Sequence, residues 1–159
     1  PDWVRQSQPT QQNSGPLVTP SVPIAKTDLN QADKQQLMRV YGIGDKLSDR
    51  IIAFRSRIGG FAADFQLYDI VGLDSVTVQN LMKSFTVMHP PAIEKRDVNT
   101  ATYDELRAIP YLSNFLARQI ITYRQNHGPI NNLEELTKIQ DFPTERLRSL
   151  SLYLYVKKL

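Results

Sequence analysis

Cysteine is absent from this 159-residue sequence. Its absence excludes disulfide bonds, thiolate zinc sites and cysteine nucleophiles together. A chain without cysteine fits a reducing or an oxidising compartment equally well. This absence therefore narrows the possible chemistry and leaves the localisation open.

Residues and motifs typical of catalytic sites are also scarce. The two histidines, His89 and His127, do not lie in a metal-binding spacing such as H-E-x-x-H, and the sequence has no P-loop, G-x-S-x-G or dinucleotide fingerprint. Asp64, Asp69 and Asp74 could in principle gather around a cation, but their five-residue spacing does not place them on one helix face. We therefore expect a protein that is not an enzyme, with no catalytic residue, metal, cofactor or small-molecule substrate.

The sequence also lacks a strong excess of charge of either sign. The net charge is +3, yet residues 28–85 hold seven Lys and Arg against seven Asp and Glu, and residues 97–154 hold six against seven. The positive excess lies outside these two blocks. Neither block has the basic balance typical of a protein that binds nucleic acid by charge alone.

An internal repeat is the main feature that the sequence does contain. A shift of 69 residues aligns residues 28–85 with residues 97–154 without a gap, and 12 of the 58 aligned pairs are identical. The identical pairs are Asp28/Asp97, Asn30/Asn99, Ala32/Ala101, Leu37/Leu106, Leu47/Leu116, Ile51/Ile120, Ile52/Ile121, Arg55/Arg124, Gly59/Gly128, Leu67/Leu136, Ile70/Ile139 and Leu81/Leu150. The apolar positions match throughout, so the two halves are predicted to share one fold.

Two segments lie outside the repeats. Residues 1–27 are rich in Gln, Ser, Thr and Pro, which is typical of a flexible linker. Residues 88–96 contain Pro90 and Pro91, which stop a helix from running between the halves. The expected domains are residues 28–87 and 97–159.

Each repeat is predicted to form four short helices, which gives an all-α protein. Asn30 and Asn99 are placed to cap the first helix, which would run to about Val40 or Ile109. The second helix carries apolar residues with the spacing of one buried stripe and ends at a glycine C-cap. The second helix is expected to end at Gly59 in the first repeat and at Gly128 in the second. The third helix is expected over residues 65–71 and 133–140, and the fourth should begin near Asp74 and Thr144. The last residues of the second repeat could instead be extended.

The stretch "VYGIGDKL" joins the first two helices of the first repeat. Gly42 and Gly44 permit positive φ and close approach of another backbone, while Ile43 between them would point into the core. Amide groups at the start of the second helix attract anions, and Lys46 and Arg50 lie one turn apart on that helix. These residues form a candidate phosphate site.

The stretch "LMRVYGIGDKLSDRIIAFR" resembles a helix-hairpin-helix motif, in which an apolar-Gly-apolar-Gly turn joins two helices. The whole first block is similar to the tandem helix-hairpin-helix domain of ComEA-like competence DNA receptors, and the second block shares its layout. The arrangement also resembles membrane-tethered proteins of Bacteroides-group bacteria that carry several such domains. The resemblance implies two tandem double helix-hairpin-helix domains.

The resemblance also implies a function and a setting. It implies binding of double-stranded DNA through its phosphate backbone without sequence specificity, in competence-like DNA uptake. It further implies a chain cut from a longer, membrane-tethered protein on the extracytoplasmic side of a bacterial cell envelope. A cytoplasmic location is the alternative.

The match to the motif differs among the four hairpins. The first is complete, except that Ser48 replaces a small apolar residue, and the second keeps one glycine but has a carboxylate in place of the other. The four hairpins are Tyr41-Gly42-Ile43-Gly44, Val71-Gly72-Leu73-Asp74, Pro110-Tyr111-Leu112-Ser113 and Gln140-Asp141-Phe142-Pro143. The nucleic-acid-binding residues implied by this comparison are Tyr41, Gly42, Ile43, Gly44, Lys46, Arg50 and Gly72.

Two other interpretations remain open. "GIG" could be only a tight connection between helices, although the third and fourth hairpins, which contain no glycine, suggest that glycine is not needed to turn the corner. The protein could also be a scaffold of helical repeats, with Tyr111 and Phe115 of the second repeat contacting a protein partner. Arg124, which matches Arg55, is expected to make a structural hydrogen bond to a neighbouring turn.

Overall fold

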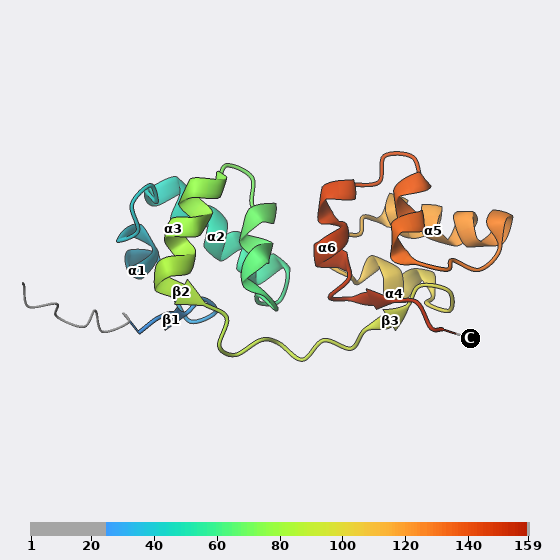
Figure 1. Cartoon of the computed structure of the whole chain (residues 1–159), viewed down its shortest axis with the longest axis horizontal. Helices are drawn as coiled ribbons and strands as arrows, with labels where there is room; N and C mark the ends of the chain where they lie inside the picture. The colour runs from blue at the N-terminus through green and yellow to red at the C-terminus, as the bar shows by residue number, and fades with distance from the viewer. Residues whose placement is uncertain (1–24, 159) are drawn as a thin grey trace, which may run out of the picture.

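The computed structural model describes residues 25–158 of the chain. It shows two helical lobes that lie side by side, joined by an extended segment along one edge (Figure 1). The two lobes have the same order of elements, apart from an additional short 3₁₀ helix before the last helix of the second lobe, which confirms the predicted all-α tandem repeat. The linker expected over residues 1–27 lies outside the described residues except for its last three positions.

The first repeat consists of four helical segments closed by a pair of two-residue strands. Its elements are β1 (Thr27–Asp28), α1 (Lys34–Met38), α2 (Asp45–Arg57), the 3₁₀ helix η1 (Asp64–Asp69), α3 (Ser75–Ser84) and β2 (Phe85–Thr86). The elements of the second repeat are β3 (Arg96–Asp97), α4 (Tyr103–Arg107), α5 (Asn114–His127), the 3₁₀ helices η2 (Leu133–Lys138) and η3 (Thr144–Arg146), α6 (Leu147–Leu150) and β4 (Leu154–Tyr155).

The strands bring the two ends of each repeat together. β1 pairs with β2, and β3 pairs with β4, each in parallel. Phe85 follows directly after α3 and lies in β2, because the chain there becomes extended to pair with β1. The extended ending considered for the second repeat is confirmed at Leu154–Tyr155.

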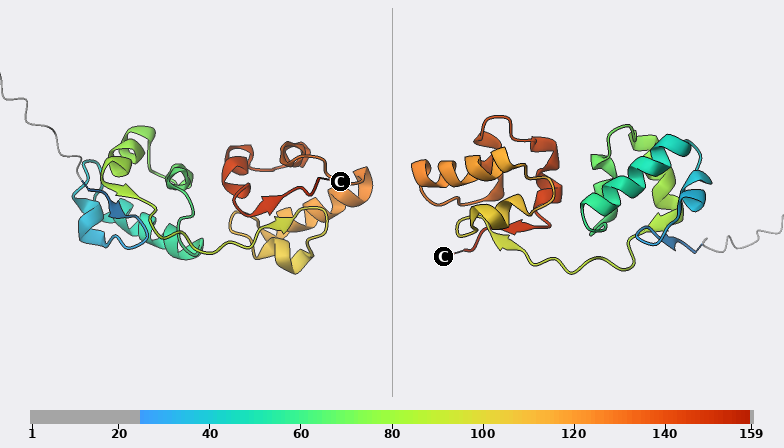
Figure 2. Two further views of the ribbon diagram at one scale, coloured as in Figure 1. Left: turned by 60° about the horizontal axis from the view of Figure 1, so that its bottom comes forward. Right: turned by 180° about the vertical axis from the view of Figure 1, so that it is seen from behind.

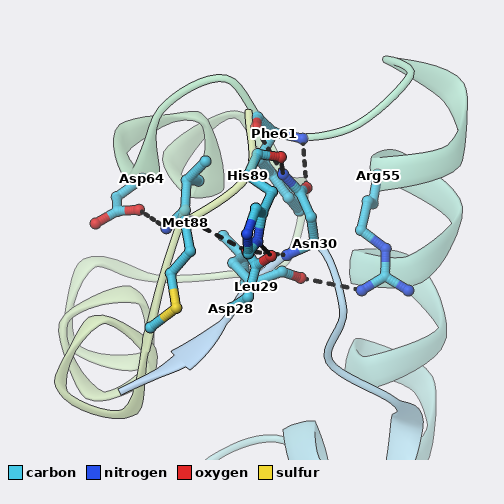
Figure 3. Close-up of polar contacts among 9 residues, drawn as sticks. Asp28, Leu29, Asn30, Arg55, Phe61, Asp64, Met88 and His89 are labelled. Carbon is cyan, nitrogen blue, oxygen red and sulfur yellow. Dashed lines mark hydrogen bonds and ion pairs between the residues drawn. The ribbon is translucent and has the colours of Figure 1, made fainter. Parts of the chain in front are cut away.

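The first-helix caps differ from the prediction. The N-cap residues are Asp33, which accepts a hydrogen bond from the amide of Gln36, and Thr102, which accepts one from the amide of Glu105. Asn30 does not cap this helix. Its side chain donates to the carbonyl of Phe61 (2.9 Å) and accepts from the same residue's amide (2.7 Å), so it joins the start of the repeat to the turn after α2 (Figure 3).

The second repeat repeats these long-range contacts. The side chain of Asn99 donates to the carbonyl of Ile130 (2.8 Å) and accepts from the amide of the same residue (2.7 Å). The Nη1 atom of Arg55 donates to the carbonyls of Leu29 and Ala32, and Arg124 donates in the same way to two carbonyls of its own repeat. The structural role expected for this arginine pair is confirmed.

Each lobe has its own hydrophobic core, and one side chain packs against both cores. This side chain is Tyr111, at the third hairpin. Its hydroxyl donates to Asp69 (2.9 Å) and accepts from the side-chain amide of Gln66 (3.1 Å), which also donates to Tyr153 (3.0 Å). Burial and the neighbouring Asp69 carboxylate raise the pKa of Tyr111, so its neutral hydroxyl remains a donor.

Two further contacts join the lobes beside this cluster. Ser149 donates to Asp69, and the guanidinium of Arg148 lies 3.9 Å from the centre of the Phe65 ring. The two lobes therefore meet through side chains, in addition to the covalent segment that is visible in both views of Figure 2.

Candidate nucleic-acid interface

All four hairpins have the same turn hydrogen bond. In the first hairpin, the amide of Ile43 donates to the carbonyl of Val40 at 3.0 Å. The equivalent bonds in the other hairpins are Leu73 to Ile70, Leu112 to Ile109 and Phe142 to Ile139, each at 3.2 Å. The four hairpins are thus one backbone structure formed by four different sequences.

One position in each turn has a left-handed backbone. The φ angles are 92° at Gly42, 93° at Gly72, 79° at Tyr111 and 60° at Asp141. The expectation that glycine is not needed to turn the corner is therefore confirmed, because Tyr111 and Asp141 adopt positive φ at this position. The turn requires positive φ, which costs a residue with a side chain about 1–2 kcal/mol, and the second repeat tolerates that cost.

The glycines at this position also bring the first two hairpins together. A Cβ atom at Gly42 would lie 3.2 Å from the hydroxyl of Thr77 on α3, the helix after the second hairpin. A Cβ atom at Gly72 would collide with Arg50 on α2, the helix after the first hairpin. Each hairpin therefore packs against the helix that follows the other, so the two hairpins share one face.

Gly44 has no such structural reason to be glycine. Its φ is −102°, and an added Cβ atom would meet nothing within 4 Å. It is the N-cap of α2, and no side chain accepts a hydrogen bond from the first turn of that 13-residue helix. Asp74 and Ser113 supply this bond to α3 and α5. The first-turn amides of α2 are therefore left for an external acceptor.

Charges around this helix start are partly arranged in ion pairs. The ammonium group of Lys34 contacts Asp45 (2.6 Å) and Asp49 (2.9 Å), the two acidic residues nearest the first hairpin, and their hydrogen bonds raise the pKa of Lys34. Lys46 is exposed and has no ion pair among the described residues. Arg50 is also exposed, and its Nη1 atom donates to the carbonyl of Val71 at 3.1 Å.

The tips of the first two hairpins project into solvent. Tyr41 is 90% exposed and Val71 is 75% exposed, whereas Ile43 is buried as expected. Val71 was not among the predicted residues. A shift of 30 residues aligns it with Tyr41, so a comparison of the first two hairpins within the repeat could have identified it.

The predicted site residues belong to the first two hairpins and to the start of α2. Gly42 and Gly72 hold the two hairpins together, Tyr41 projects from a tip, and Ile43 anchors the turn in the core. Gly44, Lys46 and Arg50 lie along the first two turns of α2.

The third hairpin is arranged differently. Tyr111 fills the junction between the lobes, and α5 has a side-chain cap from Ser113. The exposed Phe115 lies on the first turn of that helix. The fourth hairpin places the Asp141 carboxylate at the surface.

The three aspartates considered for a cation site each have a structural partner. Asp64 accepts from Thr86 and Val87, Asp69 takes part in the junction, and Asp74 caps α3. Among residues 25–158, no cluster of His, Asp and Glu has the geometry to hold a metal ion. Within the same range, the helices are too short or too polar to span a bilayer.

The sequence matches the helix-hairpin-helix motif family twice, over residues 22–86 and 92–155. The chain belongs to the helix-hairpin-helix family. Helix-hairpin-helix motifs are generally nucleic-acid-binding. The narrower resemblance of this helix-hairpin-helix chain to ComEA-like receptors and to Bacteroides-group proteins stays a prediction.

The helix-hairpin-helix chain is also similar to proteins named endonuclease/exonuclease/phosphatase family domain-containing protein 1. It is 23% identical to the Danio rerio protein over 150 residues, which covers 84% of this chain and 27% of that protein. The Mus musculus protein is 24% identical and the Homo sapiens protein 23% identical, each over 142 residues that cover 72% of this chain and 25% of the relative. The chain thus spans about a quarter of the length of these relatives. No solved structure matches it significantly.

These relatives correct the expectation that the protein is not an enzyme. That expectation rested on catalytic motifs missing from this sequence, whereas the relatives are named for an endonuclease/exonuclease/phosphatase family domain. A sequence that matches only a quarter of such proteins does not exclude catalysis by lacking those motifs.

Proposed function

We propose that this helix-hairpin-helix chain binds double-stranded DNA through its phosphate backbone, without sequence specificity, at the first hairpin. The open N-terminus of α2 carries this proposal. Gly44 leaves the first-turn amides without a side-chain acceptor, although neither its φ nor its packing requires glycine. A phosphate oxygen fits such amides, because they donate hydrogen bonds at the positive end of the helix dipole.

The surroundings of α2 support a nucleic-acid phosphate as the occupant. Lys46 and Arg50 add two cations within the first two turns, and Lys34 engages the carboxylates of Asp45 and Asp49. The exposed tips at Tyr41 and Val71 would meet a groove of the duplex between its two backbones. Contacts to phosphates position a protein on DNA but carry no sequence information.

Substitution of Gly44 by aspartate tests the proposal. Gly44→Asp places a carboxylate where the phosphate would bind, and aspartate is a favourable N-cap, so the helix should keep its stability. We expect the parent to bind unrelated 20-base-pair duplexes equally at low salt, with affinity that falls steeply as salt rises. We expect Gly44→Asp to weaken this binding by about tenfold or more, because the carboxylate accepts from the first-turn amides in place of a phosphate and repels the phosphate.

The control is Ser113→Asp at the equivalent N-cap position of α5, where Ser113 already fills the site. It adds the same charge to the second repeat and should leave DNA affinity nearly unchanged. A parent that does not bind duplex DNA at low salt, or a Gly44→Asp variant that binds as the parent does, would contradict the proposal. Failure of the parent to bind would favour the protein scaffold, with Phe115 as its exposed apolar residue.

The biological setting is a separate proposal. Competence-like DNA uptake on the extracytoplasmic side of a bacterial envelope follows from the resemblance to ComEA-like receptors alone. Fractionation of the source cells with an antibody against this chain tests the location. Recovery of the chain from the cytoplasm would contradict it.

A second candidate function comes from the relatives' name. We propose that a repeat pair of this kind holds DNA for an endonuclease/exonuclease/phosphatase family domain when one chain carries both. In such a chain, Gly44→Asp should reduce plasmid cleavage to the same extent as binding. Undiminished cleavage would separate the two activities.

A further inference from the structure

A concave, arginine-rich surface lies where the two repeats meet. It has a volume of about 270 Å³ and is lined by α2, by the end of η1 with the start of the second hairpin, and by one residue of the second repeat. Arg50 and Arg57 come from α2, and Arg146 comes from η3. We call this surface, with Asp69 at its edge, the junction groove.

The three guanidinium groups of the junction groove are positioned by uncharged neighbours. Arg50 donates to the carbonyl of Val71, Arg57 lies 5.0 Å from the centre of the Phe54 ring, and Arg146 lies 5.9 Å from the centre of the Tyr111 ring. Stacking and single hydrogen bonds leave most of the donors of each arginine available.

None of these three arginines forms an ion pair within residues 25–158, although other cations of the chain do. Lys34 contacts two carboxylates, and Arg96 contacts Glu94 and Glu105. Asp69 is the one acidic residue that lines the junction groove, and its carboxylate accepts from Tyr111 and Ser149. Three cations against one carboxylate leave the groove positive.

The junction groove continues the charged face of α2 that begins at the first hairpin. Lys46, Arg50 and Arg57 are spaced by four and seven residues, so they lie on one side of the helix. They span about 16 Å, because an α-helix rises 1.5 Å per residue. A DNA strand carries one phosphate per about 3.4 Å of duplex axis, so this length extends over several phosphates.

We infer that the junction groove binds a second phosphate of the same duplex and that the second repeat contributes to DNA binding through Arg146. The inference rests on the proposed function. The hairpins of the second repeat take no part, because Tyr111 is packed between the lobes and Asp141 places a carboxylate at the surface. Arginine suits this role, because its planar fork can bind two phosphate oxygens at once.

Removal of one charge from the groove tests the inference. Arg146→Gln should weaken duplex binding about fivefold to tenfold and reduce the slope of log affinity against log salt by about one. Arg146→Lys should keep the salt slope, because it keeps the charge. The matched control is Arg118→Gln, which removes another arginine of the second repeat that lies over a tyrosine, 5.5 Å from the Tyr103 ring centre, and should leave affinity within about twofold.

The outcomes separate this inference from the proposed function. Parent binding that Gly44→Asp weakens and Arg146→Gln does not would overturn the junction groove alone. Equal losses of DNA affinity in Arg146→Gln and Arg118→Gln would also overturn the inference, because the change in net charge would then explain the loss in each variant. A parent that does not bind would overturn both proposals. Equal thermal unfolding of the parent and Arg146→Gln confirms that the change acts on binding and not on folding.

Discussion

Two glycines two residues apart in one hairpin have different roles. Gly42 has a φ of 92° and a neighbour 3.2 Å from the site of a Cβ atom, so both backbone and packing favour glycine there. Gly44 has an ordinary φ and open space around it. In the motif "GIG", the first glycine therefore has a structural role, and the second leaves the first-turn amides of α2 without a side-chain acceptor.

This difference predicts opposite effects on stability. Gly42→Ala should lower the free energy of unfolding by about 1–2 kcal/mol, because alanine must adopt positive φ and contact Thr77. Gly44→Ser should raise it by about 0.3 kcal/mol, because serine is a slightly better N-cap than glycine. Urea unfolding followed by circular dichroism measures both values. A Gly42→Ala protein as stable as the parent would show that the turn relaxes without strain.

At the scale of elements, the closing strands depend on one buried carboxylate in the first repeat. Asp28 of β1 accepts from the amides of Asn30 and Met88, each at 3.1 Å, and pairs with the ring of His89 at 2.8 Å (Figure 3). Burial alone would raise the pKa of Asp28, but the hydrogen bonds from His89, Met88 and Asn30 outweigh it and hold the pKa below its usual value. Asp28 thus fixes the chain just after β2.

The lowered pKa of Asp28 predicts a dependence of stability on pH. Its contribution should be complete above about pH 4, the usual aspartate pKa, and should be lost as the pH falls through the lower pKa of the folded state. Asp28→Asn should cost about 1–3 kcal/mol at neutral pH and flatten the stability profile below pH 4. Thermal unfolding measured from pH 7 to pH 3 tests this.

The control for this prediction is Asp97→Asn at the equivalent position of the second repeat. Asp97 accepts from the amide of Asn99 but has no imidazole partner among the described residues. Asp97→Asn should therefore lower the free energy of unfolding by less than Asp28→Asn does. Equal acid sensitivity in the parent and Asp28→Asn would show that other carboxylates set the profile.

The elements were predictable where a period defines them. Leu47 and Ile51 repeat at helical spacing, and the gapless repeat gave two independent samples of each helix. The caps were not predictable in the same way, because Asn30 and Asp33 both suit an N-cap and only the position of Phe61 decides between them. The face shared by two hairpins depends on Gly72 meeting Arg50, a contact that no local pattern encodes.

At the scale of the whole molecule, the two repeats are coupled through the third hairpin. Tyr111 packs against both cores and donates to Asp69 across the junction. In the sequence, this hairpin has no glycine, whereas the first hairpin has two. Tyr111 contacts the other repeat of the same chain. The sequence could not reveal this contact, because the apolar pattern of each repeat predicts only the core of that repeat and not how the two lobes pack together.

This coupling predicts one cooperative unfolding transition for residues 25–158. Tyr111→Ala should lower the free energy of unfolding by about 2–3 kcal/mol, because a half-buried ring and its hydrogen bonds are removed, and should separate the transitions of the two repeats. Differential scanning calorimetry would show two peaks in place of one. Phe115→Ala, at a residue that is 51% exposed, is the control and should keep the single peak. A single unshifted peak for Tyr111→Ala would contradict the coupling.

The uncapped start of α2 can be recognised in a sequence without any structure. The four equivalent positions hold Gly44, Asp74, Ser113 and Pro143, and the aspartate and serine each bond the first turn of their own helix. A single nucleotide change can turn a glycine codon into one for serine or aspartate. In any set of similar chains, the residue at this position would therefore indicate for each hairpin whether the first turn of the following helix has a side-chain cap. Glycine would indicate an uncapped helix, and aspartate or serine a capped one.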